Sequence, residues 1–157
     1  MSSKYTFSLD DICAILPHRP PFLFVDRIID MVPGKRITGE RMLHSDEPHF
    51  SGHFPGKPVM PGVLVTDALA QTCGLLWGFT KMVRADEAAT SAASELFYLA
   101  SATMKYVNPA YPGDTLRLHA ATERSFDRLH GFTAEATCGR RIIARGSLTL
   151  AMMEGAV

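Results

Sequence analysis

The sequence predicts an α+β fold in which a mostly antiparallel sheet curves around one central helix. Two observations carry this prediction. Residues 62–83 are apolar on nearly every helical face, which is typical of a helix buried on all sides. Four strand-like segments follow that helix, and runs of strands separated by short turns favour an antiparallel sheet. A helix that is apolar all round needs a cover, and a curved sheet wound around it provides one with few elements.

The N-terminal third predicts a short helix and a strand pair. Ser8 with an acid three residues later is typical of a helix N-cap, and Pro17 ends the helix. Aromatic and β-branched residues then predict a strand, and the turn at Pro33-Gly34 leads into its partner. The expected elements are a helix over Leu9–Leu16 and strands over Phe22–Ile29 and Arg36–Leu43.

A long loop over residues 45–62 separates this strand pair from the central helix. The loop holds four prolines and three glycines, together with histidines and aromatic residues. Loops of this length inside compact domains are usually functional or disordered, and the composition favours function. The central helix is expected to begin at Pro61-Gly62, with proline near its first turn, and to end near Val83.

The C-terminal half predicts four more strands after a small-residue connector over residues 84–94, which we expect to be mobile. Proline and glycine turn signals separate these strands. We therefore expect residues 1–157 to form a single domain with the hot-dog fold, a sheet wrapped around a central helix. The expected strands are 95–106, 115–126, 131–138 and 141–152.

Composition excludes several classes of function. The 157 residues carry 16 basic and 16 acidic side chains, and this balance gives no overall field for binding nucleic acid or an anionic membrane. Three cysteines without a C-x-x-C pair argue against a disulfide framework and for a reducing, cytoplasmic compartment. The N-terminus lacks the apolar region of a signal peptide, and a buried core helix explains the apolar stretch 63–79 better than a membrane span, because the stretch is short and contains Asp67 and Gln71.

Asp67 and Gln71 are the first candidates for a functional site. They stand four residues apart on the predicted central helix and so share one face. A buried carboxylate is costly unless it is paired or its pKa moves upward. On its own this pair is equally compatible with two polar side chains that merely satisfy each other.

The loop before the helix supplies two further candidates, His53 and Gly62. Prolines make the segment around His53 rigid, and such a strained loop is hard to justify as a mere connector. The N–H of Gly62 has no partner within the helix and has the positive end of the helix dipole behind it, so it is suited to hold a developing thioester oxyanion. A base, an acid and such a donor together suggest chemistry next to a carbonyl group.

Weaker candidates surround these residues. Phe54, Val63 and Tyr98 are candidates for lining a substrate tunnel, although core packing is the better explanation of Tyr98. A metal site built from His49, His53 and Asp67 is conceivable. We expect no metal, because a dry apolar tunnel already explains the histidine and the acid.

Several motifs resemble the beta-hydroxyacyl-acyl-carrier-protein dehydratases of fatty acid synthesis. The most specific is the run GHFPGKPVMPGVLVTDALAQ, from Gly52 to Gln71, and the resemblance extends from Leu9 to Met152. The supporting motifs are Pro17-His18-Arg19, the run from Phe22 to Arg27, the run from Ser45 to Pro48 and the turn Pro112-Gly113-Asp114.

The resemblance implies dehydration of a (3R)-hydroxyacyl thioester to the trans-2-enoyl thioester. The substrate would arrive on the phosphopantetheine arm of acyl carrier protein, with no other cofactor. By the same resemblance, His53 removes the alpha proton, Asp67 protonates the leaving hydroxyl, Gln71 orients Asp67 and Gly62 provides the backbone donor. The resemblance also implies a homodimer, or a trimer of such dimers, in which each site takes His53 from one chain and Asp67 from the other.

Two departures from the family pattern leave alternatives open. The FabZ-type branch normally has Glu where this chain has Asp67, whereas Asp is typical of the FabA-type branch, whose members include isomerases. Chain length, isomerisation and a specialised pathway therefore stay open. Arg124 and Arg128 are the only basic residues where the FabZ-type branch often has a basic cluster; they would meet the acidic carrier, or form a solvated strand end. A hot-dog thioesterase and a non-catalytic acyl-binding partner subunit are the alternative functions.

Overall fold

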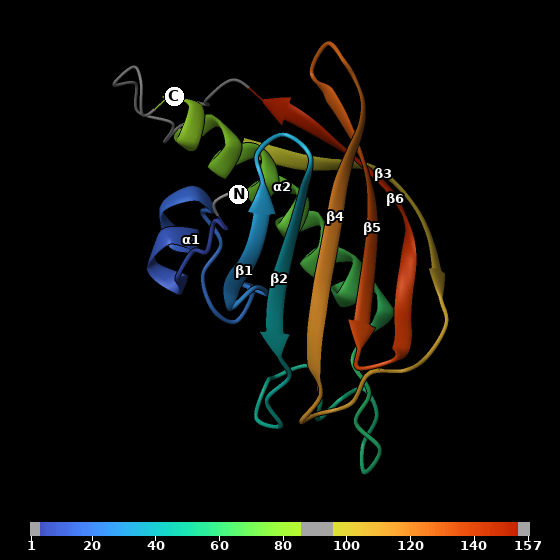
Figure 1. Cartoon of the computed structure of the whole chain (residues 1–157). Helices are drawn as coiled ribbons and strands as arrows, with labels where there is room; N and C mark the ends of the chain where they lie inside the picture. The colour runs from blue at the N-terminus through green and yellow to red at the C-terminus, as the bar shows by residue number, and fades with distance from the viewer. Residues whose placement is uncertain (1–3, 86–95, 154–157) are drawn as a thin grey trace.

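The protein forms one curved antiparallel sheet with a long helix lying across its concave face (Figure 1). The computed structural model describes residues 4–85 and 96–153. The sheet has six strands in the order β1-β2-β4-β5-β6-β3, and every neighbouring pair is antiparallel. The elements are α1 (Leu9–Ile15), β1 (Arg27–Val32), β2 (Arg36–Met42), α2 (Gly62–Ala85), β3 (Leu96–Tyr106), β4 (Thr115–Phe126), β5 (Leu129–Cys138) and β6 (Arg141–Met153).

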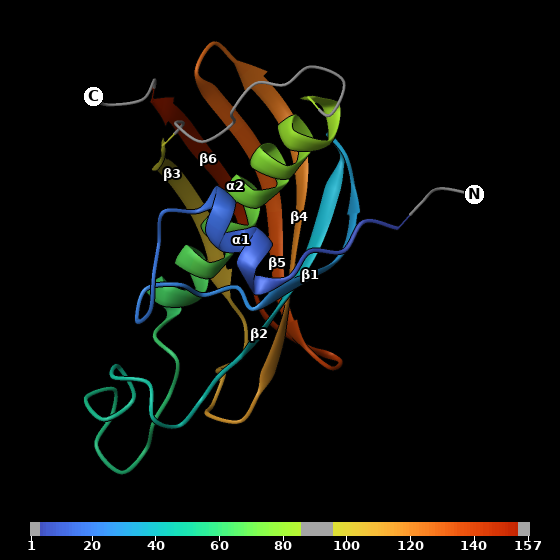
Figure 2. The same cartoon turned by 90° about the vertical axis from the view of Figure 1, so that its left-hand side faces the viewer.

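Helix α2 forms the centre of the core, as its sequence predicts. Most of its side chains are buried between the sheet and α1, which covers it on the side away from the sheet (Figure 2). Gly78 allows this close packing, because a Cβ there would lie 2.4 Å from the side chain of Ile15. The burial is not complete, since Val63 in the first turn is 72% exposed. This arrangement is the hot-dog fold expected from the sequence.

The prediction of a strand over Phe22–Ile29 is wrong in its position. The strand β1 begins only at Arg27 and runs on to Val32. The segment before it lies outside the sheet because its backbone bonds to a side chain of α2: the Phe24 N–H donates to Gln71 Oε1, 2.8 Å away. Aromatic and β-branched residues indicate extended backbone correctly but do not say which partner satisfies it.

Other expected boundaries differ by one or two residues. Ser8 caps α1 in a complete capping box with Asp11, as predicted, and the helix ends at Ile15 rather than Leu16. Arg84 and Ala85 belong to α2 rather than to the predicted connector, and residues 86–94 of that connector lie outside the described residues. Strand β5 begins at Leu129 instead of Gly131, because a tight turn with Asp127 at φ 56° lets β4 and β5 pair almost to their ends.

The two edges of the sheet differ. Strand β1 is short, and its edge is partly covered by a bridge between Phe7 and Ile28. Strand β3 has eleven residues, of which most are exposed, and its outer edge carries no neighbouring strand within the described part of the chain. A long open edge of this kind is a ready template for pairing with another chain.

Candidate active site

The buried amide of Gln71 holds Asp67 in a fixed place on α2. The Gln71 Nε2 group donates to Asp67 Oδ2 at 2.8 Å and to the carbonyl of Phe22 at 3.0 Å. Its Oε1 accepts from the Phe24 N–H. Gln71 is 3% exposed, so its amide is fully used between the helix and the segment 22–24. The structure thus brings together Asp67 and Gln71 as the helical spacing predicts, and adds a backbone clamp that the spacing did not show.

The environment of Asp67 favours its protonated form. Burial raises the pKa of the Asp67 carboxyl above its usual value of 3.8, and the hydrogen bond from Gln71 and the nearby charge of His18 offset only part of this rise. A carboxyl group with a raised pKa keeps its proton to a higher pH than an exposed carboxyl does, which is the direction that suits proton delivery to a leaving group. This side chain therefore has the properties of a general acid.

Gly62 lies at the N-terminus of α2, one turn before Asp67. Within the described residues no backbone carbonyl outside the helix accepts its N–H, so this donor stays available at the positive end of the helix. A Cβ at Gly62 would lie 3.0 Å from the ring of Tyr106, whose hydroxyl is bonded to Thr66 Oγ1 at 2.6 Å. Glycine thus allows Tyr106 to pack closely against the start of α2, a feature that the sequence did not reveal.

His53 stands in the loop that extends beyond the end of the sheet (Figure 1). Its ring Nδ1 lies 2.7 Å from the carbonyl oxygen of Val59, and Val59 N–H donates back to the carbonyl of His53 at 2.7 Å. If Nδ1 carries the hydrogen and donates to Val59, Nε2 is left as the free basic nitrogen. The geometry therefore suits His53 to act as a general base through Nε2.

In a single chain the two candidate catalytic side chains have different hydrogen-bond partners. No hydrogen bond or ion pair joins His53 to Asp67 among the described residues, and the polar partners of Asp67 come from its own helix and from the 18–24 segment.

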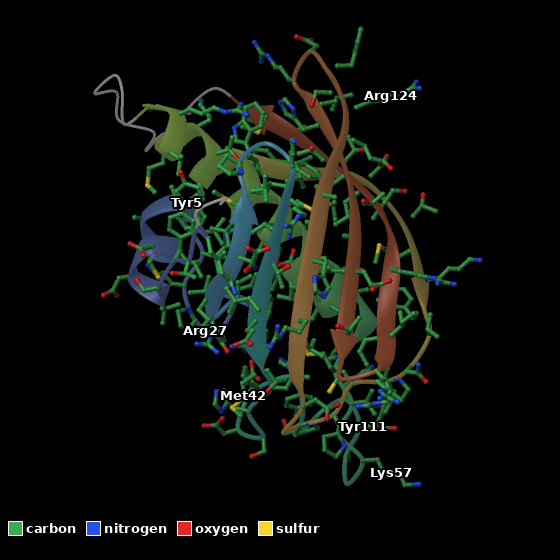
Figure 3. The ribbon with its side chains drawn as sticks, viewed as in Figure 1. Tyr5, Arg27, Met42, Lys57, Tyr111 and Arg124 are labelled. Atoms are coloured by element: carbon green, nitrogen blue, oxygen red, sulfur yellow. The ribbon has the colours of Figure 1, made fainter. Side chains whose placement is uncertain are left out.

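The weaker candidates are all exposed. Phe54 is 56% exposed beside the His53 ring, Val63 is in the first turn of α2, and Tyr98 is 53% exposed on β3. Arg124 and Arg128 lie in the β4–β5 hairpin, at the opposite end of the sheet from the His53 loop; Figure 3 labels Arg124 at one end and Lys57 at the other. None of these five side chains forms part of the core of the single chain.

The described residues offer two further observations on alternative sites. They contain no cluster of three or more His, Cys, Asp or Glu side chains that could hold a metal ion. A hollow of about 720 Å³ lies on the outer face of the sheet. Its lining includes Lys105, His119 and Arg145 but neither His53 nor Asp67.

Helix α2 is long and apolar enough to span a membrane, but most of it is buried, as in the core helix of a globular domain.

Three groups near the site were not expected from the sequence. His18 lies close enough to Asp67 for its charge to act on the carboxyl. Tyr106 and Thr66 brace the first turns of α2. No periodic pattern marks these residues, and only the Pro17-His18-Arg19 motif draws attention to one of them.

The fold and the helix-borne acid define a hot-dog enzyme. The FabA-like domain family matches residues 16–147, and this chain belongs to that family. It is 37% identical over 145 residues to a 3-hydroxyacyl-[acyl-carrier-protein] dehydratase FabZ from Roseiflexus sp. (strain RS-1), covering 92% of this chain and 96% of that protein. It is 40% identical over 143 residues to the protein of the same name from Geobacter metallireducens, covering 90% and 91%.

Solved structures confirm the fold. A chain in the dehydratase heterocomplex ApeI:P from Xenorhabdus doucetiae superposes with a TM-score of 0.75 at 20% identity, with 91% of each chain covered. The fluoroacetyl-CoA thioesterase FlK superposes with a TM-score of 0.57 at 15% identity, covering 79% of this chain and 89% of that one. These likenesses establish the hot-dog fold, while the sequence relatives establish the family.

Proposed function

We propose that this protein dehydrates (3R)-hydroxyacyl thioesters carried by acyl carrier protein and releases the trans-2-enoyl thioester. The observation that carries the proposal is the Gln71-held carboxyl of Asp67 on the central helix, with its pKa raised by burial. The membership of the FabA-like family and the names of the sequence relatives support the same substrate class. The reaction needs no cofactor besides the phosphopantetheine arm of the carrier.

In the proposed reaction His53 acts as base and Asp67 as acid. Nε2 of neutral His53 removes the alpha proton while the N–H of Gly62 stabilises negative charge on the thioester oxygen. The electrons of the broken C–H bond form the new double bond as the C–O bond breaks, and protonated Asp67 delivers its proton to the departing hydroxyl. Water leaves, and the proton on His53 returns to Asp67 to restore both groups.

We propose a homodimer in which the open edges of two β3 strands pair. The exposed length of β3 supports this arrangement, because pairing would satisfy its free backbone groups and cover Tyr98 and Leu99. His53 of one chain would then act with Asp67 of its partner. A trimer of such dimers would leave these contacts unchanged.

Antiparallel pairing also gives Arg124 and Arg128 a role. A two-fold axis between the β3 strands places opposite ends of the two sheets together, so the β4–β5 hairpin of one chain would lie at the same end as the partner's His53 loop. Two arginines there would attract an acidic carrier protein and speed its encounter. We place the enzyme in the cytoplasm, the compartment that suits its free cysteines.

The test incubates the purified protein with 3-hydroxyacyl carrier-protein substrates of several chain lengths and measures enoyl products, with trans-2 and cis-3 isomers separated. We expect the trans-2 product, and His53→Ala and Asp67→Ala should each lower the rate by about 10²–10⁴-fold. Release of free carrier thiol without enoyl product would instead favour the thioesterase alternative. Tight binding without any turnover would favour a non-catalytic partner subunit.

A further inference from the structure

Arg41 is a buried cation that joins two carboxylates from different segments. Its side chain, on β2, is 10% exposed. One guanidinium nitrogen donates to Asp26 Oδ1 at 3.0 Å, and the other donates to Glu47 Oε1. The guanidinium also lies over the ring of Phe24, 5.8 Å from its centroid. A single side chain therefore ties the 24–26 segment to the base of the loop that carries His53.

Glu47 uses both of its oxygens in this junction. Oε1 accepts from Arg41, and Oε2 accepts from the backbone N–H of His44 at 2.8 Å. Its side chain is 12% exposed, so water screens these bonds weakly. The carboxylate thereby closes the first turn of the loop and fixes it to the sheet.

From Glu47 a series of short turns leads to His53. The Glu47 N–H donates to the carbonyl of His44, the Phe50 N–H to that of Glu47, and the His53 N–H to that of Phe50, at 3.2, 3.2 and 3.3 Å. Phe50 is 2% exposed and anchors the middle of the series in the core. Each turn starts where the previous one ends, so a shift at Glu47 passes along the backbone to the imidazole.

We propose that Glu47, held by Arg41, is a positioning residue that sets the place of the His53 imidazole. It touches neither substrate nor reacting atoms in this role and acts through the three turns. This inference rests on the proposed function, since it assumes that His53 is the base. A displacement of about 1 Å in a reacting group costs roughly 10²-fold in rate, so a loose loop base is enough to impair catalysis.

The variant Glu47→Gln tests the proposal because it keeps the size of the side chain. Arg41 and the His44 N–H donate to different oxygens of Glu47, and a glutamine has an NH₂ group in place of one of them, so one donor would face another donor. We expect kcat to fall about 10- to 100-fold while KM changes little. Asp30→Asn is the matched control, because it removes the Asp30–Arg36 ion pair on the same sheet, away from the loop; its kcat should equal that of the wild type.

A wild-type kcat in folded Glu47→Gln protein would overturn the proposal. If that variant does not fold, Arg41→Lys replaces it, since an ammonium keeps the charge but cannot bridge Asp26 and Glu47 with a planar fork. The same fall in kcat is expected, and an unchanged kcat would overturn the proposal equally.

Mixed dimers separate positioning from a general loss of structure. A dimer of one His53→Ala chain and one Asp67→Ala chain retains one intact site, whose histidine comes from the Asp67→Ala chain. Adding Glu47→Gln to that chain should lower the rescued activity as it lowers kcat, and adding it to the His53→Ala chain should leave it unchanged. An equal loss in both placements would overturn the proposal.

The mixed dimers also distinguish the hypothesis of a shared active site from the hypothesis that Glu47 positions His53. If the mixed dimer has no activity despite demonstrated subunit exchange, the shared site of the proposed function fails. The kcat of the Glu47→Gln homodimer still decides whether Glu47 positions His53.

Discussion

The two halves of the candidate site are built in different ways. Asp67 lies on a buried helix and is held by Gln71. Gln71 in turn bonds to the backbone of Phe24 and Phe22, which lie 47 and 49 positions earlier in the chain. His53 sits in an exposed loop and is held by bonds to residues no more than six positions away. The acid is therefore part of the core of the fold, whereas the base depends on local turns and one ionic junction. Substitutions on the acid side should affect stability and activity together, while those on the loop side should affect activity alone.

The largest expected effect on stability is that of Gln71→Leu. It leaves the Phe24 N–H and the Phe22 carbonyl without their partner, and each buried unsatisfied group costs about 1–3 kcal/mol. The free energy of unfolding should fall by about 2–5 kcal/mol in denaturant titrations. His53→Ala is the loop-side comparison and should cost under about 1 kcal/mol. Equal losses in the two variants would remove the distinction between the halves.

Two glycines of the motif from Gly52 to Gln71 offer a smaller contrast. A methyl group at Gly62 would press on the Tyr106 ring at 3.0 Å, whereas at Gly52 it would meet nothing within 4 Å. Gly62→Ala should therefore destabilise the protein by about 1 kcal/mol, toward the low end for overpacking because the ring is partly exposed. Gly52→Ala should leave the melting temperature unchanged. A larger loss at Gly52 than at Gly62 would contradict the close packing against Tyr106.

Asp67→Asn probes the burial of the acid through its dependence on pH. Because burial raises the pKa of Asp67, the folded state binds this proton more tightly than the unfolded state. This tighter proton binding stabilises the folded state fully at pH values below 3.8, the ordinary pKa of an aspartate. The stabilisation is lost as pH rises through the raised pKa of Asp67. The asparagine variant should therefore gain stability relative to wild type as pH rises over that range. A stability difference that does not change with pH would contradict the raised pKa.

The smallest expected effect is that of replacing Arg124 and Arg128 together with glutamine. Both side chains are exposed in a hairpin, so stability should stay within about 0.5 kcal/mol of wild type. At low salt KM should rise for a carrier-protein substrate and stay the same for a small thioester, and added salt should reduce the difference. An equal rise in KM for both substrates would argue against a carrier-binding role.

Prediction from the sequence succeeded where interactions are local. The capping box of Ser8 and Asp11 lies within four residues, and its pattern located α1 to within one residue. The apolar length of α2 identified the core helix, since its burial follows from composition alone. The shift of β1 from the predicted Phe22–Ile29 to Arg27–Val32 has a non-local cause. The side chain of Gln71, far along the chain, forms hydrogen bonds with the backbone of Phe22 and Phe24.

The same division applies to the candidate site. Helical spacing by itself determined that Asp67 and Gln71 share a face, and the motif from Gly52 to Gln71 determined the family, because both depend on the order of residues along the chain. Only the tertiary structure decided that Gln71 clamps the 22–24 segment, that Tyr106 fills the space at Gly62 and that Arg41 joins the loop to the sheet. Those contacts depend on which side chains the folded sheet brings within reach, and no local pattern in the sequence encodes that.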